Sequence, residues 1–209
     1  MKGVDLAIKV AVICYSATGN VYGLARATEE GAKEAGAEAR LRKVRELASE
    51  EAIKSNQGWY DHTLVTEDVP EASIEELEWA DAYLFGTPTR CGNVSAQPKQ
   101  FWTRPAECGS RASSPKGRQQ LQQRAEPARQ ESTIISMYNV FMRWGSIVVP
   151  PGYTDPVLFE AGGNPCGTSS TDGGENGQAS RNSPPPATRG GAWPRRPPSS
   201  PARGCRLVA

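Results

Sequence analysis

The feature that most restricts the fold is a short apolar run that passes directly into a polar turn and a helix-like segment. Residues 9–16 read KVAVICYS and are apolar or β-branched almost throughout. Such a run predicts a strand buried on both faces of a parallel sheet. After the turn ATGN, small and apolar residues recur at helical spacing from Val21 to Ala35, and Gly36 is expected to end the helix. A strand followed by a helix is the repeating unit of α/β folds.

The same alternation continues along the chain. Short apolar runs predict further strands, and segments with apolar residues at helical spacing lie between them. The pattern predicts an α/β fold with a parallel sheet and right-handed crossovers. The further predicted strands are residues 37–44, 81–88 and 146–152, and the further predicted helices are residues 73–80 and 131–145.

Three local features refine this prediction. Ser73 and Glu76 have the spacing of a capping box at the start of the helix over residues 73–80. Residues 48–72 are polar and form an excursion from the sheet, in which the chain's only histidine, His62, is expected to be solvated. Pro98 is expected to interrupt the helix that begins a few residues before it.

Two segments break the alternation. Residues 102–130 lack apolar periodicity, and residues 176–209 hold seven of the 17 prolines and no acidic residue. Their net charges are +4 and +6, whereas residues 1–101 carry −5. Their composition predicts disorder, and no strand is predicted between Phe101 and Glu131, where a parallel sheet needs one.

Composition excludes several classes of protein. No apolar run approaches the roughly 20 residues that a membrane-spanning helix needs, and no signal peptide is predicted at the N-terminus. With one histidine and no CxxC pair, neither a metal site nor a disulfide framework is predicted, and the reducing cytoplasm is the expected location. The five cysteines are scattered singly, as Cys14, Cys91, Cys108, Cys166 and Cys205.

The turn at residues 16–20, Ser-Ala-Thr-Gly-Asn, predicts a phosphate site. Hydroxyl groups and backbone N–H groups converge there at a helix N-terminus, where the helix dipole favours an anion. The patterns GxxxxGK[ST] and GxGxxG are both absent, so neither nucleoside triphosphate hydrolysis nor the dinucleotide fingerprint is supported. The alternative is a plain capped helix start.

A second loop, Gly86 to Asn93, also follows the carboxyl end of a predicted strand. In doubly wound sheets, ligands bind along that edge, so the two loops can hold a phosphate at one end and a flat ring at the other. Gly86 and Gly92 would permit close approach of the backbone to a ring, and Arg90 could stabilise negative charge on a reduced isoalloxazine. The alternative is an ordinary connecting loop.

Five motifs together resemble one family: YSATGNVYGLA, FGTPTRCGN, QEST, WGSIVVPPGYTDPVLF and GGNPCGTSSTDG. They are similar to the WrbA family of flavodoxin-like NAD(P)H:quinone oxidoreductases, over roughly residues 8–101 and 131–175. The resemblance implies a flavodoxin-like doubly wound sheet with helices on both faces, non-covalently bound FMN, and commonly a tetramer. NAD(P)H would reduce the flavin and a quinone would take two electrons from it, with no side chain needed as acid or base.

The resemblance also implies roles for individual residues. The turn would hold the FMN phosphate, the second loop would lie along the ring, and Thr18 would also meet the nicotinamide substrate. Arg143 stands where the family has a histidine near the flavin. The implied cofactor-binding residues are Ser16, Ala17, Thr18, Gly19, Asn20, Val21, Thr89, Arg90, Cys91 and Arg143.

The chain is expected to consist of one domain, residues 1–175, and a tail, residues 176–209. The aberrant segment inside the domain, residues 102–130, and the tail both suggest a shifted reading frame. Codons for Trp102 to Pro115, read in another frame, can encode DQTGGVWVEGKLA, which is family-like. Two more such strings, VGSSFSSAQNPHG and ELTAARYQGRRVAEAASKLA, fit residues 117–129 and 181–201. As written, the chain is expected to lack a central strand and to leave two unpaired strand edges. The alternative functions are a flavodoxin-type electron carrier and a non-catalytic basic protein that binds nucleic acid.

Overall fold

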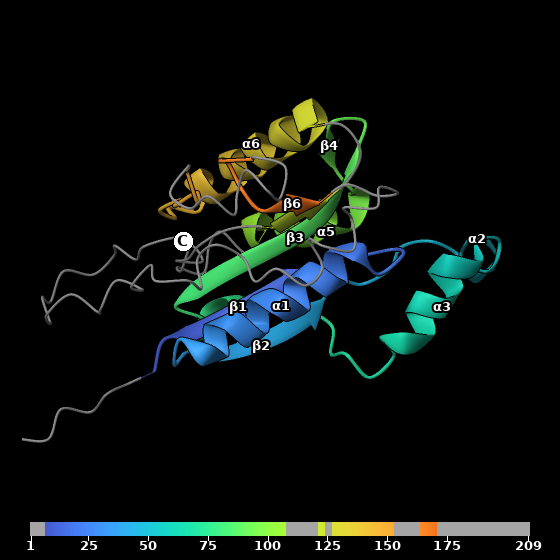
Figure 1. The fold of residues 1–209 in the computed structure, drawn as a ribbon, viewed down its shortest axis with the longest axis horizontal. Coiled ribbons are helices and arrows are strands. Elements are labelled where there is room, and N and C mark those ends of the chain that lie inside the picture. The colour runs from blue at the N-terminus through green and yellow to red at the C-terminus, as the bar shows by residue number, and fades with distance from the viewer. Residues whose placement is uncertain (1–6, 108–120, 124–126, 153–163, 171–209) are drawn as a thin grey trace, which may run out of the picture.

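The computed structural model describes residues 7–107, 121–123, 127–152 and 164–170. The segment of residues 176–209 and most of the segment of residues 102–130 therefore lie outside the described residues. Within the described part, a mostly parallel sheet is covered by helices on both faces, as predicted (Figure 1). The strands are β1 (Lys9–Cys14), β2 (Glu38–Lys43), β3 (Ala82–Arg90), β4 (Asn93–Val94), β5 (Leu121–Gln123) and β6 (Ser169–Ser170).

The strand order is β2-β1-β3-β5-β6, and these neighbours pair in parallel. The short strand β4 lies outside this path and pairs antiparallel with the end of β3. In the centre, Val12 of β1 pairs with Leu41 of β2 and Leu84 of β3. All three carboxyl ends therefore lie at one edge of the sheet, which confirms the expected edge arrangement of the loops.

The apolar run of β1 is buried because both faces of the sheet are covered. Val10 and Val12 face helix α1 (Asn20–Glu34), while Ala11 and Ile13 face the opposite layer. All four are fully buried. Gly36, with a φ of +85°, lies just beyond the end of α1, in the left-handed conformation that glycine adopts at helix ends.

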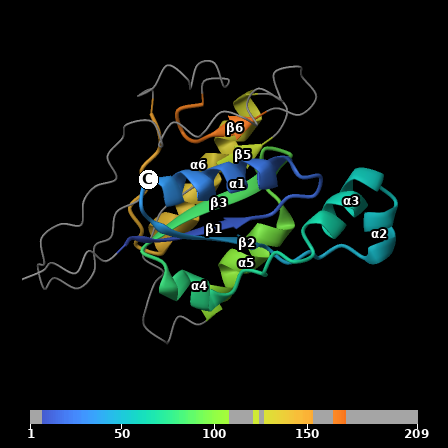
Figure 2. The ribbon, with the colours of Figure 1, turned by 60° about the horizontal axis from the view of Figure 1, so that its bottom comes forward.

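The opposite layer consists of α4 (Ile74–Trp79), α5 (Ala96–Glu107) and α6 (Pro127–Arg143). Figure 2 shows α1 on one side of the sheet and α4 and α5 on the other. Phe85 of β3 stacks on Phe141 at 4.9 Å between ring centroids, and Trp102 and Trp144 pack edge-on against Phe85. This aromatic cluster joins α5 and α6 to the central strand and anchors the layer.

The expected gap in the sheet is corrected by β5. Leu121 pairs with Gly86, and Gln122 pairs with both Thr87 and Ser169, so β3 and β6 each have a partner. β5 was not predicted because it contains no apolar run. Its ladders with β3 and β6 are formed by backbone N–H and C=O groups, which glutamine supplies as well as apolar residues do.

Two further predictions for the second half of the chain are wrong. Residues 146–152 form irregular chain and not a strand, because Pro150 and Pro151 cannot donate to a ladder. The edge position is taken by β6 instead. Pro98 does not interrupt α5, since it lies in the first helical turn, where its missing N–H has no helical partner to lose.

The helix α4 is confirmed, but its capping box is not. Ser73 is the N-cap residue, yet its side chain makes no capping hydrogen bond to the helix. Glu76 instead accepts a hydrogen bond from Arg42 Nε at 2.7 Å, because β2 brings a guanidinium within reach of its carboxylate. The ion pair thus joins α4 to β2.

The excursion of residues 48–72 contains two helices, α2 (Glu50–Lys54) and α3 (Gln57–Val65). They project beyond the carboxyl edge of the sheet, away from the layers (Figure 1). Ser49 and Asn56 cap them through side-chain oxygens that accept from Ala52 N and Trp59 N. Among the described residues, no helix is long and apolar enough to cross a membrane.

Candidate functional site

A cavity of about 510 Å³ lies at the carboxyl edge of the sheet. Three parts of the chain enclose it: the turn after β1, the end of β3 with the start of α5, and the excursion that carries α3. Its lining residues are Tyr15, Ser16, Ala17, Thr18, Val21, Asn56, Trp59, Pro88, Arg90, Val94, Ser95, Ala96 and Gln97. The structure thus brings the two predicted loops to one cavity.

The turn between β1 and α1 has the form of an anion cradle. Ser16 Oγ accepts a hydrogen bond from Gly19 N–H at 3.1 Å, which closes the turn. Gly19 is the N-cap residue of α1 with a φ of +94°, and no acidic side chain lies in the first turn of the helix. The first amides of a helix have no intrahelical partners and carry the positive end of its dipole. The residues present therefore fit a phosphate group.

The end of β3 sends alternate side chains to opposite faces. Pro88 and Arg90 line the cavity, but Thr89 is buried on the side of α6, where its Oγ1 lies 3.4 Å from Thr133 Oγ1. Arg90 is exposed and donates from Nη1 to the carbonyl of Thr89 at 3.1 Å. Of these two predicted ring-binding residues, only Arg90 lines the cavity.

Cys91 and Gly92 form the two-residue turn of the β3–β4 hairpin. Their φ angles are +51° and +73°, and the pairs Thr89–Val94 and Arg90–Asn93 flank them. Positive φ at both central residues is the signature of a type I′ turn. Cys91 is exposed and is not among the residues that line the cavity, although it directly follows Arg90, which is.

The roles expected for two glycines are corrected. A Cβ at Gly86 would lie 2.7 Å from Val21 Cγ1 and 3.0 Å from Cys14 Cβ, so this glycine lets α1 pack on β3 rather than a ring approach the backbone. Gly92 is required by the positive φ of the hairpin turn. The prediction for these two glycines was wrong because the sequence does not show which part of the molecule packs against a glycine.

Arg143 lies at the C-terminal end of α6, away from the cavity. The N-terminal part of α6 reaches the hairpin, where Ser132 Oγ donates to the carbonyl of Gly92 at 3.0 Å. Eleven residues later, Arg143 is about 16 Å further along the helix axis. Within a single chain, the structure does not bring Arg143 to the other predicted site residues.

A carboxylate that the sequence analysis did not single out organises the cavity wall. Glu46 Oε2 accepts from Tyr15 Oη at 2.8 Å and from Trp59 Nε1 at 3.1 Å, and Oε1 accepts from Gln97 Nε2 at 2.7 Å. Oε1 also accepts two backbone N–H groups, from Leu47 and Ala48. The side chain therefore ties the sheet edge, α5 and α3 together.

The surroundings of the Glu46 cluster keep the Glu46 carboxylate ionised and the Tyr15 phenol protonated at neutral pH. Burial by itself raises the pKa of Glu46, but the hydrogen bonds from Gln97, Ala48, Tyr15 and Leu47 outweigh burial and lower it. Burial and the neighbouring carboxylate raise the pKa of Tyr15 far above its usual value.

The position of Glu46 in the sequence could have drawn attention to it. Glu46 follows a predicted strand, so it falls at the edge of the sheet where ligands bind.

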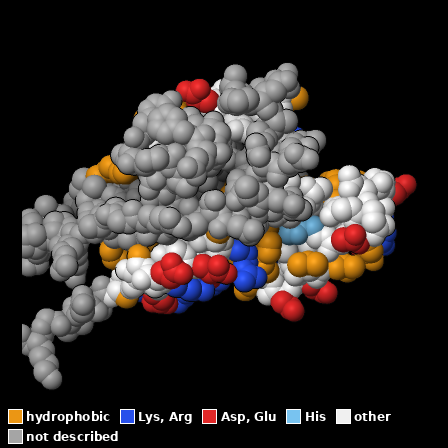
Figure 3. Space-filling model, in the orientation of Figure 1, with side chains coloured by type: hydrophobic (Ala, Val, Ile, Leu, Met, Phe, Trp, Pro, Cys, Tyr) orange, Lys and Arg blue, Asp and Glu red, His pale blue; other side chains and the backbone are white. Residues whose placement is uncertain are grey.

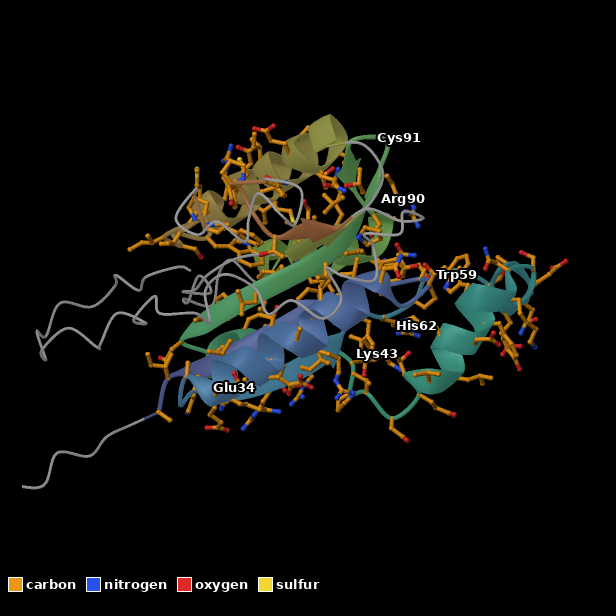
Figure 4. All side chains as sticks on the ribbon, in the orientation of Figure 1. Glu34, Lys43, Trp59, His62, Arg90 and Cys91 are labelled. Atoms are coloured by element: carbon orange, nitrogen blue, oxygen red, sulfur yellow. The ribbon has the colours of Figure 1, made fainter. Side chains whose placement is uncertain are left out.

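His62 is half-buried and not fully solvated, which corrects its expected exposure. Its ring meets Tyr22 of α1 edge-on, with 5.4 Å between centroids, and its Nδ1 lies 3.3 Å from the place a Cβ of Gly19 would occupy. Burial and the charge of Lys43 lower the pKa of His62. The prediction failed because α3 folds back toward the turn, which a polar sequence does not reveal (Figure 4).

Thiols and metal ligands contribute little to the cavity. Cys14, Cys91 and Cys166 are free thiols, and burial raises the pKa of Cys14 to about 12. Within the described ranges, no three His, Cys, Asp or Glu side chains are grouped so as to hold a metal ion.

Comparison with known proteins gives consistent matches. A family model described as NADPH-dependent FMN reductase matches residues 8–125. A protein of Deinococcus radiodurans named NAD(P)H dehydrogenase (quinone) is 38% identical over 175 residues, covering 80% of this chain and 85% of that protein. A protein of the same name from Sinorhizobium fredii is 33% identical over 178 residues, covering 80% and 84%.

Among solved structures, this chain is similar to a flavodoxin, WrbA-like protein from Agrobacterium tumefaciens. The TM-score is 0.53 and the sequence identity 19%, with 84% of this chain and 91% of that chain covered. At that identity the likeness concerns the fold, and it is consistent with the strand order β2-β1-β3-β5-β6.

Proposed function

Because the chain belongs to the family of NADPH-dependent FMN reductases, we propose that it is an FMN-dependent NAD(P)H dehydrogenase that reduces quinones. The observation that carries the proposal is the single cavity bounded by both the anion cradle after β1 and the guanidinium of Arg90. The names of the homologous proteins supply the electron donor and the acceptor class.

The turn at residues 16–21 would hold the FMN phosphate, and the cavity beyond it would hold the ring. Bound FMN supplies the two-electron chemistry that couples NAD(P)H oxidation to quinone reduction. Arg90 places a positive charge at the cavity wall, where it would stabilise negative charge on a ligand. Thr18, which is exposed in the same wall, would meet the nicotinamide substrate.

The Glu46 cluster acts as a scaffold for the cavity and not as an acid or base. The ionised carboxylate accepts the Tyr15 proton in a hydrogen bond, and the raised pKa of Tyr15 keeps that proton on the phenol oxygen at neutral pH. Gln97 donates to both groups, so the three side chains have one arrangement. The chain's own residues thus orient and shield the ligands.

The test is quinone-dependent oxidation of NAD(P)H by protein loaded with FMN. We expect turnover with benzoquinone, and a loss of about tenfold in kcat/KM for Arg90→Ala because a cavity-wall charge is removed. Lys54→Ala is the matched control, since Lys54 is exposed on α2 in an ion pair with Glu50, and it should leave kcat/KM unchanged. One-electron exchange with protein partners but no quinone turnover would favour an electron carrier and contradict the proposal.

The proposal extends to assembly and location. Ile135 and Met142, seven residues apart on α6, are 48% and 62% exposed, which favours self-association along that helix, and the family resemblance gives a tetramer. The free thiols at Cys14, Cys91 and Cys166 favour the reducing cytoplasm. Light scattering of the eluted protein tests the tetramer, and a monomer at micromolar concentration would contradict it.

A further inference from the structure

His62 is a titratable group that the proposed reaction does not use. It lies on α3, outside the sheet, yet its ring lies against both the N-cap residue of α1, Gly19, and Tyr22, almost one helical turn later. Figure 4 shows His62 on the face of α3 that is turned toward α1, and the histidine, pale blue in Figure 3, is visible from outside. The imidazole is therefore both beside the anion cradle and open to a ligand.

The surroundings of His62 are electropositive. Lys43, at the end of β2, faces it and is held in place by hydrogen bonds from Nζ to the carbonyls of Thr66 and Glu67, at 2.6 and 3.3 Å. Tyr22 faces it from α1, and on its own helix the adjacent Asp61 is engaged by Gln57 Nε2 at 2.7 Å. The His62 ring thus lies beside a helix N-terminus that has no acidic side chain in its first turn, and the charge of Lys43 acts on that ring.

Packing alone does not account for this arrangement. The described residues give the His62 ring nitrogens no hydrogen-bond partner, although the side chain is half-buried. A half-buried imidazole next to an ammonium group has an unfavourable charged form, and an anion in the cradle would remove that cost. The site therefore has the chemistry of an anion ligand that becomes charged when the anion arrives.

We infer that protonated His62 binds the phosphate of FMN, so that α3 adds a pH-dependent side-chain ligand to the backbone cradle after β1. The inference rests on the proposed function, because it names a residue that regulates cofactor affinity at the same site. Binding of FMN would then take up a proton at His62, and the contribution of His62 to affinity would rise as the pH falls.

The sign of the pH dependence of FMN affinity follows from the linkage between proton binding and phosphate binding. Without the phosphate, burial and Lys43 lower the pKa of His62, so the ring is neutral at pH 8. A dianionic phosphate attracts the proton and raises that pKa, and the same free energy appears as tighter binding at low pH. The second ionisation of the phosphate, near pH 6, acts in the opposite direction, so the wild-type protein must be compared with a variant at each pH.

The test is a titration of the protein with FMN, followed by flavin fluorescence, at pH 5.5 and pH 8. Wild type should bind FMN roughly fivefold more tightly than His62→Gln at pH 5.5 and equally tightly at pH 8. Riboflavin, which lacks the phosphate, should bind both proteins equally at both pH values. His62→Lys keeps a cation throughout, so its affinity relative to wild type should rise between pH 5.5 and pH 8.

A second readout does not depend on a variant that folds. His62 is the chain's only histidine, so one imidazole resonance reports its titration by NMR. FMN should move the midpoint upward by about 0.7 pH unit, which corresponds to the fivefold coupling.

Three results separate the two proposals. An unchanged midpoint with FMN bound, or an equal loss of FMN and riboflavin affinity in His62→Gln, would overturn the role of His62 and leave the proposed function standing. A folded wild-type protein that binds no FMN at either pH would overturn both.

Discussion

At the residue scale, Cys91 holds a conformation that its side chain disfavours. It has a φ of +51° in a two-residue hairpin turn, where asparagine and glycine are preferred. Cys91→Asn should therefore stabilise the protein by about 0.5–1 kcal/mol, seen as a rise of about 1–4 °C in Tm.

The matched control is Cys91→Ala, which removes the thiol but keeps a Cβ in the left-handed region. It should leave Tm within about 1 °C of the wild type, since the strain remains. An equal gain in both variants would assign the effect to the thiol and contradict the turn argument.

Glu46 is the second residue whose effect can be predicted. Glu46→Gln places an amide N–H₂ among donors such as Trp59 Nε1 and Gln97 Nε2, so we expect a loss of about 1–2 kcal/mol at pH 7 in urea unfolding. Because the folded-state pKa of Glu46 is lowered, its stabilising effect is present above about pH 4.5 and is lost as the pH falls through that lowered pKa. The difference between the two proteins should therefore shrink toward pH 3.

Glu50 provides the comparison for Glu46. It is exposed on α2 and pairs with exposed Lys54, so Glu50→Gln should leave the urea midpoint nearly unchanged. A similar loss in both variants would show that the charge of the excursion, and not the Glu46 cluster, carries the effect.

At the element scale, the position of α1 on the sheet depends on the missing side chain at Gly86. A Cβ there would lie 2.7 Å from Val21 Cγ1, so Gly86→Ala must push α1 away from β3 and should cost about 1–3 kcal/mol. The same shift displaces the anion cradle, so FMN affinity should fall as well. Thermal unfolding and flavin titration measure the two effects.

Gly23, within α1 itself, is the control for this prediction. A Cβ at Gly23 meets nothing within 4 Å, so Gly23→Ala should gain about 0.5–1 kcal/mol from helix propensity and leave FMN affinity unchanged. Destabilisation by both substitutions would mean that the tight contact at Gly86 is not what matters.

The elements also show where sequence patterns succeed. β1 was predicted from a continuous apolar run, and α1, β2 and α6 from the spacing of their apolar residues, because burial leaves both patterns visible in the sequence. β5 was missed because Leu121 to Gln123 pair through backbone groups, and residues 146–152 were misassigned because apolar content outweighed two prolines.

At the scale of the whole molecule, the strands on one side of the sheet pair over more residues than those on the other. β1 and β2 pair over six residues, whereas β5 pairs with β3 over three and with β6 over two. In addition, the indole N–H of Trp102 is buried without a partner among the described residues. Both features fall at or near the segment of residues 102–130, whose composition suggests a shifted reading frame.

Restoring the family-like strings should therefore strengthen the molecule. With the three alternative-frame strings in place of residues 102–115, 117–129 and 181–201, we expect stability to rise by about 2 kcal/mol or more, or roughly 4–8 °C in Tm, with tighter FMN binding. Scrambled versions of the same strings are the control. No gain over the scrambled versions would refute the frame hypothesis. Resequencing the coding DNA near codons 101, 116, 130 and 180 separates a sequence error, which small insertions or deletions there would show, from a diverged gene, in which every residue is confirmed.

The sequence by itself determined the α/β class, the two loops at one sheet edge and the anion-fitting turn, because burial periodicity and turn chemistry are local properties. Tertiary structure alone decided that Glu46 joins Tyr15, Trp59 and Gln97, that Thr89 turns away from the cavity, and that His62 reaches the turn at Gly19. These contacts join residues far apart along the chain, or depend on which face of a strand a side chain takes. Their partners are therefore chosen by how the layers pack, which no local pattern encodes.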